Sequence, residues 1–174
     1  LHGLFGMLDN WQTLARKWAE AYHVVLLDLR NHGRSFHADE MNYAVMAEDV
    51  AATLENMGID ECVLLGHSMG GLISARLLLK HQDKFNAAVL SGAAIKSPQE
   101  PPAWQVHVIR NLAKLFPALK VLELEADKVS RDPEVVRKYF ADPLVSTEKL
   151  SAKFLVSMFE AMEDVKVIEG CMWR

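Results

Sequence analysis

A serine set between two glycines is the pattern with the clearest chemical potential in this sequence. Gly66-His-Ser-Met-Gly70 follows a short apolar run, Cys62 to Leu65, and leads into an apolar segment that begins at Gly71. The first run is too short for a helix, and the second has the apolar residues of a buried one. A serine at such a corner between strand and helix can present its hydroxyl as a nucleophile, provided that the flanking positions are small. We therefore predict that Ser68 is a nucleophile; the alternative is a glycine-rich turn with an incidental serine.

The sequence begins with a second candidate element, His2-Gly3-Leu4-Phe5-Gly6. A His-Gly pair followed by a small, irregular loop suits a backbone that must bring an N–H group towards a developing oxyanion. A helical pattern with one apolar face follows the loop. Its apolar residues are Trp11, Leu14, Ala15 and Trp18.

A continuous apolar run from His23 to Leu29 predicts a strand that is buried on both faces. This run leads into a polar loop that contains Asp28 and residues 30–35. Asp28 and His32 could act as an acid and a base. We favour a structural role for both, because loops at strand ends usually use their polar groups to bind their own backbone.

The remaining elements of the first half alternate between helix and strand. Residues 43–57 follow a helical period that Gly58 ends, and Phe85 to Leu90 forms another short apolar run. This alternation predicts an α/β fold, with a parallel sheet flanked by helices and joined by right-handed crossovers. Functional residues of such sheets lie at the carboxyl ends of the strands, which is where Ser68 falls.

A proline-rich break after Lys96 divides the chain. We predict an α/β core over 1–96, a helical cap inserted over 97–164, and the start of another core strand in 165–174. The Met, Phe and Leu residues of the cap fit ordinary packing better than contacts with an acyl chain, although a lipid interface is a second partner that this cap suits. Helices are expected at 104–115, 132–141 and 147–162.

Composition excludes several classes of protein. The net charge is −4 and no cluster of Lys or Arg occurs, which argues against nucleic-acid binding. No run approaches the roughly 18 apolar residues of a membrane span. The first residues lack a secretory pattern, so we expect a cytoplasmic protein. We expect no cofactor, no metal site and no disulfide between Cys62 and Cys171.

These motifs, in this order, resemble the α/β-hydrolase superfamily. His2-Gly-Leu-Phe-Gly6 and Arg30-Asn-His-Gly33 are similar to small serine esterases. Ser130-Arg-Asp-Pro-Glu-Val-Val-Arg-Lys-Tyr139 and Asp142-Pro-Leu-Val145 resemble the cap of monoacylglycerol lipases and lysophospholipases. The resemblance covers nearly the whole chain.

The resemblance implies hydrolysis of monoacylglycerol-like or other small acyl esters through an acyl-enzyme at Ser68. The N–H groups of Leu4 and Met69 would hold the oxyanion, while a histidine oriented by an acid would take the serine proton. His67 is an elbow residue in these families and is not that base.

The acid and the histidine of this superfamily lie on loops after later strands. After Ser68 the sequence contains only His81 and His107, and neither follows a predicted strand. We assign neither residue as the base and no residue as the acid. We therefore expect a chain that is truncated at both ends and has weak or no activity alone.

Two other interpretations remain open at this point. One is a non-catalytic protein of the same fold that binds a ligand or a partner beneath its cap. The other keeps the serine motif for different chemistry, such as that of a haloperoxidase or a hydrolase of C–C bonds.

Overall fold

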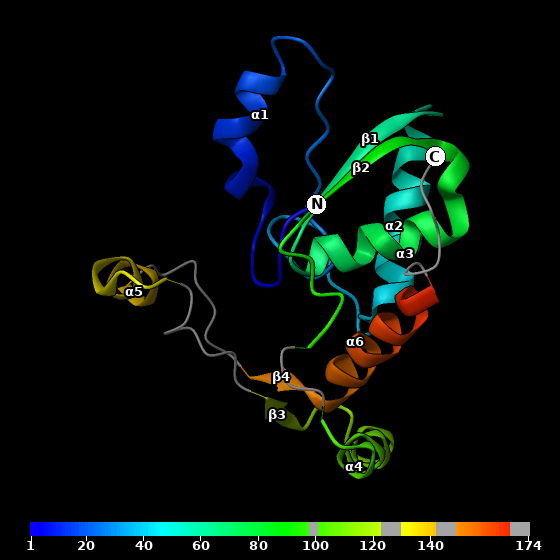
Figure 1. The fold of residues 1–174 in the computed structure, drawn as a ribbon, viewed down its shortest axis with the longest axis vertical. Helices are drawn as coiled ribbons and strands as arrows, with labels where there is room; N and C mark the ends of the chain where they lie inside the picture. The colour runs from blue at the N-terminus through cyan, green and yellow to red at the C-terminus, as the bar shows by residue number, and fades with distance from the viewer. Residues whose placement is uncertain (98–100, 123–129, 142–148, 168–174) are drawn as a thin grey trace. The chain divides into compact units, whose positions relative to one another are not determined.

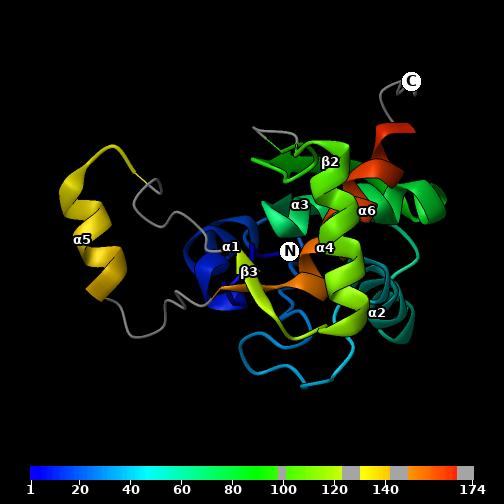
Figure 2. The same ribbon diagram turned by 90° about the horizontal axis from the view of Figure 1, so that it is seen from below.

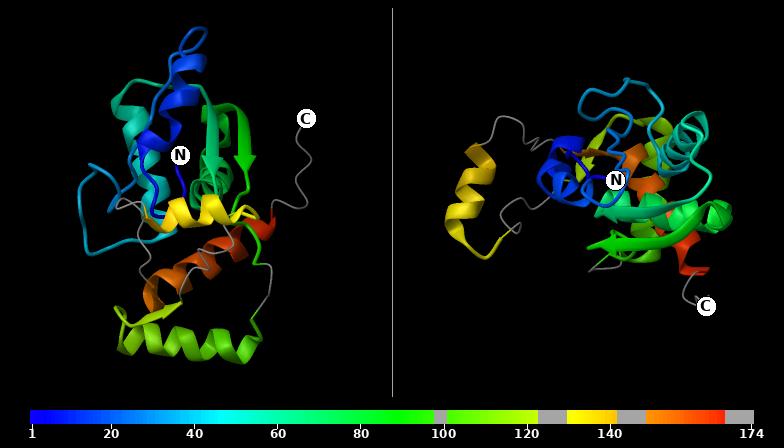
Figure 3. Two further views of the ribbon diagram at one scale, coloured as in Figure 1. Left: turned by 90° about the vertical axis from the view of Figure 1, so that its left-hand side faces the viewer. Right: turned by 90° about the horizontal axis from the view of Figure 1, so that it is seen from above.

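A computed structural model describes residues 1–97, 101–122, 130–141 and 149–167, and two parallel strands form the sheet that leads to Ser68. Strand β1 (Cys62–His67) pairs with β2 (Phe85–Ser91), and the register ends with His67 facing Ser91. Figure 3 shows both arrowheads pointing the same way. The prediction of a parallel sheet is confirmed.

Helix α3 (Met69–His81) makes the crossover between the strands and contacts both of them. Helix α2 (Tyr43–Asn56) packs against α3, so that the sheet and the two helices form successive layers (Figure 1). A short 3₁₀ helix, η2 (Gln82–Lys84), leads from α3 into β2. The core between these layers is apolar, and its deeply buried members include Tyr43, Met46, Met69, Leu72, Ile73 and Leu77.

The ends of α2 follow their sequence signals. The side chain of Asn42 accepts a hydrogen bond from the N–H of Val45 at 2.9 Å, which caps the first turn. Gly58 takes a positive φ of 66° just after the helix. The helix predicted over 43–57 and its glycine stop are therefore confirmed.

The segment before α2 differs in part from its prediction. Helix α1 (Gln12–Trp18) confirms the helix that the one-faced pattern predicts, and a 3₁₀ helix, η1 (Leu8–Trp11), which the pattern does not predict, precedes it. Residues 23–29, however, are not a strand, and that prediction is wrong. Leu1 occupies the edge of β1 instead: its nitrogen donates to the carbonyl of Leu65, and its own carbonyl accepts from the N–H of His67. Residues 23–29 thus lie beside no strand of the described chain, and an apolar run forms a strand only where a neighbour completes the ladder.

The chain divides into two units, Leu1–Pro98 with Met158–Arg174, and Gln99–Ser157. The second unit contains α4 (Ala103–Leu115), α5 (Pro133–Ala141) and a pair of short antiparallel strands, β3 (Lys120–Leu122) and β4 (Leu150–Ser151). Figure 2 shows β3 beside β4. The helices expected at 104–115 and 132–141 are confirmed, whereas the two strands are not anticipated by the sequence pattern.

Helix α6 (Ala152–Val165) corrects two further predictions. The last predicted cap helix begins at Ala152, because Leu150 and Ser151 pair with β3. Val165 is the final residue of α6, so no strand begins there, and the predicted continuation at 168–174 lies outside the described residues. Within the first unit, Asp164 of α6 forms an ion pair with Arg76 of α3. None of the helices described here is both long enough and apolar enough to span a bilayer.

Two methionines near one helix test the importance of the layer between α2 and α3. Met46 is fully buried, whereas Met57 is 47% exposed just after α2. Met46→Ala should lower the free energy of unfolding by about 2 to 5 kcal/mol, because it removes buried methylene groups and leaves a cavity. Met57→Ala should change it by less than about 0.5 kcal/mol. Urea denaturation followed by circular dichroism measures both, and equal losses would contradict this description of the core.

Candidate active site

Ser68 lies at the corner where β1 ends and α3 begins. It has φ 52° and ψ −117°, a conformation that costs a non-glycine residue energy unless its surroundings enforce it. Its N–H donates to the carbonyl of Ser91 at 3.0 Å, and its own carbonyl accepts from the N–H groups of Gly71, Leu72 and Ala94. These four bonds fix the strained turn. The side chain of Ser68 makes no capping bond to α3, and the residue is partly exposed to solvent.

Gly66 permits this corner by leaving room for the helix. A Cβ atom at position 66 would overlap the carbonyl of Gly70 and the hydroxyl of Ser74, which are both on α3. Ser74 is fully buried and donates its hydroxyl to the carbonyl of Gly70 at 2.7 Å. The strand and the helix contact each other directly at Gly66, and this contact requires the small residue that the sequence analysis predicts near Ser68.

The loop that starts at Gly3 lies against Ser68. A Cβ atom at Gly3 would be 3.2 Å from the Cβ of Ser68. The N–H of Gly6 donates to the carbonyl of Gly3 at 3.0 Å, which closes a turn and leaves the N–H of Leu4 outside this bond. Met69 is the first residue of α3, where N–H groups have no acceptor within the helix. Met69 thus follows Ser68 in the chain, and Leu4 belongs to the loop that lies against Ser68. The role of their N–H groups as oxyanion donors stays a prediction.

The polar loop after residue 29 is fixed largely by bonds to backbone atoms. Asn31 accepts from the N–H of Ala38 and donates to its carbonyl, at 2.7 and 2.9 Å. Arg30 forms a two-point ion pair with Asp49 of α2, and this pairing raises the pKa of the guanidinium. The ring of His32 contacts the carbonyl of Arg30 at 2.9 Å. These contacts support the structural role that we favoured for His32.

Two buried histidines lie beneath the loop that starts at Gly3. His2 is 1% exposed and His32 is 7% exposed, and their ring centroids are 5.0 Å apart. Burial lowers the pKa of both rings below the ordinary value, so both are neutral near pH 7. The sequence motif identified His2 only as a neighbour of Gly3. It gave no signal that the ring would be buried against the backbone of Leu29, to which it is hydrogen-bonded.

No histidine ring of the described residues is hydrogen-bonded to Ser68. The ring of His67 contacts the hydroxyl of Ser91 at 3.3 Å and meets Trp11 edge to face. His81 lies 3.9 Å from Glu48, at the far end of α3 from Ser68. His107 is exposed on α4, in the second unit. The acid and the base therefore stay unassigned, and the described residues contain no group of three His, Cys, Asp or Glu side chains that could hold a metal ion.

A parallel sheet with a strained serine between a strand and its crossover helix is the arrangement of α/β-hydrolases. Solved structures share the fold: a monoacylglycerol lipase from Paleococcus ferrophilus has a TM-score of 0.81 at 27% identity, and the match covers 95% of this chain and 65% of that one. Residues 1–168 match the family described as serine aminopeptidase S33. The chain belongs to this family of α/β-hydrolases.

Curated relatives of the chain are named as esterases and lipases. A monoacylglycerol lipase of Mycolicibacterium smegmatis is 36% identical over 160 residues, which is 87% of this chain and 56% of that protein. A putative esterase/lipase of Haemophilus influenzae is 47% identical over 77 residues, which is 44% of this chain and 27% of that protein. The chain thus spans less than two thirds of the length of each of these relatives.

Alanine substitutions at two glycines separate steric overlap from backbone strain. Gly66→Ala should destabilise the fold by about 3 kcal/mol, because the carbonyl of Gly70 is backbone and cannot move aside. Gly58→Ala meets no atom within 4 Å and should cost about 1 kcal/mol for its positive φ alone. The difference in free energy of unfolding, from chemical denaturation, measures the overlap. A smaller loss for Gly66→Ala than for Gly58→Ala would refute the close approach of β1 and α3.

Proposed function

We propose that this protein is a carboxylic-ester hydrolase that forms an acyl-enzyme at Ser68. The observation that carries the proposal is the partly exposed serine held at a positive φ between β1 and α3. Its hydroxyl would attack the carbonyl carbon of the ester. The bond from that carbon to the alcohol oxygen then breaks, water releases the acid, and the serine is restored.

The oxyanion of this reaction would be held by the backbone N–H groups of Leu4 and Met69. Each such donor is typically worth about 3 to 4 kcal/mol of transition-state stabilisation. Met69 would donate from the first turn of α3, where the helix dipole also favours negative charge. Leu4 would donate from the loop that Gly3 brings beside Ser68.

Small acyl esters and monoacylglycerol-like esters are the proposed substrates. The relatives named as monoacylglycerol lipases support this choice, since they match over most of the chain. We propose that the 174-residue chain alone is a weak catalyst, because the described residues place no acid and histidine at Ser68. A cytoplasmic location likewise stays a prediction.

Substitution of Ser68 tests the nucleophile. A fluorophosphonate should label the chain at Ser68, and Ser68→Ala should abolish both labelling and any protein-dependent hydrolysis of p-nitrophenyl butyrate. Ser35→Ala, which removes a hydroxyl from the polar loop, is the matched control and should keep both. Mass spectrometry of the labelled peptide and release of p-nitrophenol give the readouts. Equal hydrolysis by Ser68→Ala and the unaltered chain would rule out the acyl-enzyme, and absence of labelling would favour a non-catalytic protein of this fold.

Added imidazole extends the same experiment to the missing base. Imidazole should raise the hydrolysis rate of the unaltered chain more than that of Ser68→Ala, because a free base can take the proton that no described histidine accepts. Fast hydrolysis that depends on Ser68 and does not respond to imidazole would show that the chain already contains its base.

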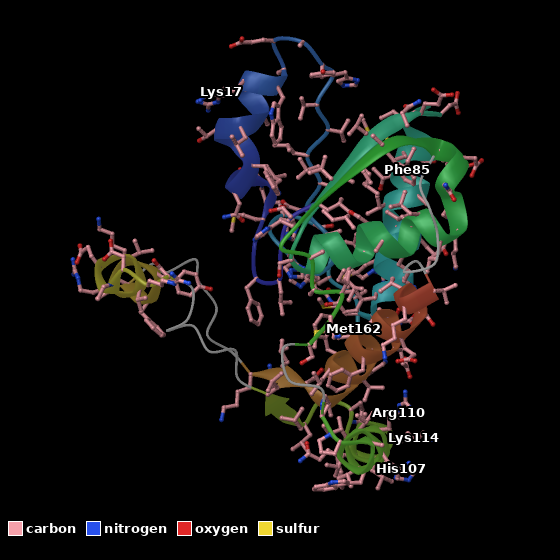
Figure 4. The ribbon with its side chains drawn as sticks, viewed as in Figure 1. Lys17, Phe85, His107, Arg110, Lys114 and Met162 are labelled. Carbon is pink, nitrogen blue, oxygen red and sulfur yellow. The ribbon has the colours of Figure 1, made fainter. Side chains whose placement is uncertain are left out.

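We further propose that α4 contacts a lipid interface. Trp104, Val108 and Leu115 are 65%, 47% and 72% exposed and lie at helical spacing along one side of α4. His107, Arg110 and Lys114 project from α4 towards one common side (Figure 4). An exposed apolar stripe on a helix whose polar face carries basic residues is typical of helices that lie at a membrane surface.

Sedimentation with lipid vesicles tests this contact. The double variant Arg110→Gln and Lys114→Gln should bind vesicles of phosphatidylcholine and phosphatidylglycerol about 25-fold more weakly, because each basic residue near an anionic surface contributes about 1 kcal/mol. Lys17→Gln on α1 is the control and should bind as the unaltered chain does. If Lys17→Gln loses as much binding as the double variant, α4 is not the docking surface.

A further inference from the structure

The loop beside Ser68 is tied at one end to Leu29 and at its other end to the neighbouring residue, Asp28. At the first end, the Nε2 atom of buried His2 accepts a hydrogen bond from the N–H of Leu29 at 3.0 Å. Its Nδ1 atom lies 2.8 Å from the carbonyl of Gly3. A neutral imidazole has one donor and one acceptor, so these contacts together require the tautomer that donates from Nδ1 to Gly3.

The second end is held by the carboxylate of Asp28. One oxygen accepts from the N–H of Leu8 at 2.7 Å, and the other accepts from the N–H of Arg34 at 2.9 Å. Asp28 therefore joins the loop of residues 3–8 to the polar loop that follows it in sequence. Each N–H group uses a different oxygen of the carboxylate, whereas an amide in its place would offer one oxygen only.

Gly33 makes room for this carboxylate. It has a positive φ of 52°, and a Cβ atom at this position would overlap the carboxyl group of Asp28. The polar loop is thus folded back closely on Asp28, which limits the positions that the carboxylate can take.

We propose that Asp28 and His2 are positioning residues that hold the loop of residues 3–8 against Ser68. Gly3 lies next to His2 and between the two ties. A Cβ atom at Gly3 would be 3.2 Å from the Cβ of Ser68. If Ser68 is the nucleophile of the proposed hydrolase, the ties fix the loop that carries the N–H of Leu4. Neither residue touches the ester in this role.

The tie at His2 is incompatible with a protonated ring. An imidazolium ion carries hydrogen on both nitrogens, so its Nε2–H would face the N–H of Leu29 instead of accepting from it. The ionisable groups that face His2 are the ring of His32, the carboxylate of Asp28 and the amino group of Leu1. Burial is the largest effect on the pKa of His2 and lowers it. The carbonyl of Gly3 and the carboxylate of Asp28 favour the charged ring, whereas His32 and the amino group oppose it, and the net effect is a lowered pKa. The loop should therefore stay tied at neutral pH and loosen as the pH falls below about 6.5.

Amide hydrogen exchange, followed by NMR, measures the ties directly. Asp28→Asn keeps the shape of the side chain but offers one acceptor oxygen for two N–H groups. Exchange protection at Leu8 or Arg34 should fall about tenfold, as expected for the loss of one hydrogen bond to a charged group. The exposed Asp39→Asn makes the same chemical change in the same part of the chain and should leave both amides unchanged. The amide of Leu72, in the core, reports whether the whole fold has weakened.

A second comparison uses pH. Protection factors at Leu8 and Leu29, corrected for intrinsic exchange, should fall between pH 7 and pH 5.5 in the unaltered chain. His2→Gln keeps a side-chain oxygen that can accept from Leu29 but does not titrate, so its protection should not follow pH in this range. If His2 contributed only by packing, His2→Gln would lower the protection factors by the same ratio at every pH.

Two outcomes overturn the inference, and they differ from failure of the proposed function. Unchanged protection at Leu8 and Arg34 in Asp28→Asn would show that the carboxylate holds neither loop. Loss of protection without any fall in the rate of fluorophosphonate labelling at Ser68, where about a tenfold fall is expected, would show that the ties do not serve Ser68. If the unaltered chain is not labelled at all, the proposed function fails, while the exchange measurements still decide whether the loop is tied.

Discussion

The close approach of β1 to α3 is the constraint on which the rest of the structure depends. Because Gly66 has no side chain, the carbonyl of Gly70 and the hydroxyl of Ser74 can lie directly against the strand. The chain must then turn from strand to helix within one residue, and Ser68 takes the positive φ that this turn demands. Four backbone hydrogen bonds, to Ser91, Ala94 and two residues in the first turn of α3, offset the strain. The same geometry leaves the serine partly exposed at the carboxyl end of the sheet.

The loops around this corner contain little regular structure, and side chains supply the order that hydrogen-bond ladders supply elsewhere. Asp28, Arg30 and Asn31 each bind two groups. Their partners are the backbone of Leu8, the backbone of the segment that contains the three residues, and the carboxylate of Asp49 on α2. Buried backbone groups must find partners, and in irregular segments short polar side chains are the nearest ones. A loop held in this way can keep a defined position beside Ser68 without belonging to the sheet.

The chain belongs to the S33 family, and curated relatives of it are named as esterases and lipases. The shared part includes the serine corner and the loop beside it. Two units divide this part, and α6 passes from one to the other. Ser68 therefore lies in the first unit, whereas the exposed apolar side chains of α4 belong to the second.

Local sequence determined the elements whose signals are local. The Gly66-to-Gly70 motif, the period over 43–57 and the apolar runs into Ser68 and Ser91 were enough to predict two parallel strands and two helices, because side-chain periodicity and glycine geometry act within a few residues.

Tertiary structure decided the rest. The run at 23–29 reads as a strand but has no neighbour to pair with among the described residues, and β3 and β4 exist only through each other. The ties from His2 to Leu29 and from Leu8 to Asp28 span 27 and 20 residues, so no periodicity could indicate them. Hydrogen bonds between distant segments form only once the chain has folded, which is why the sequence identified Ser68 but not the contacts of the loop beside it.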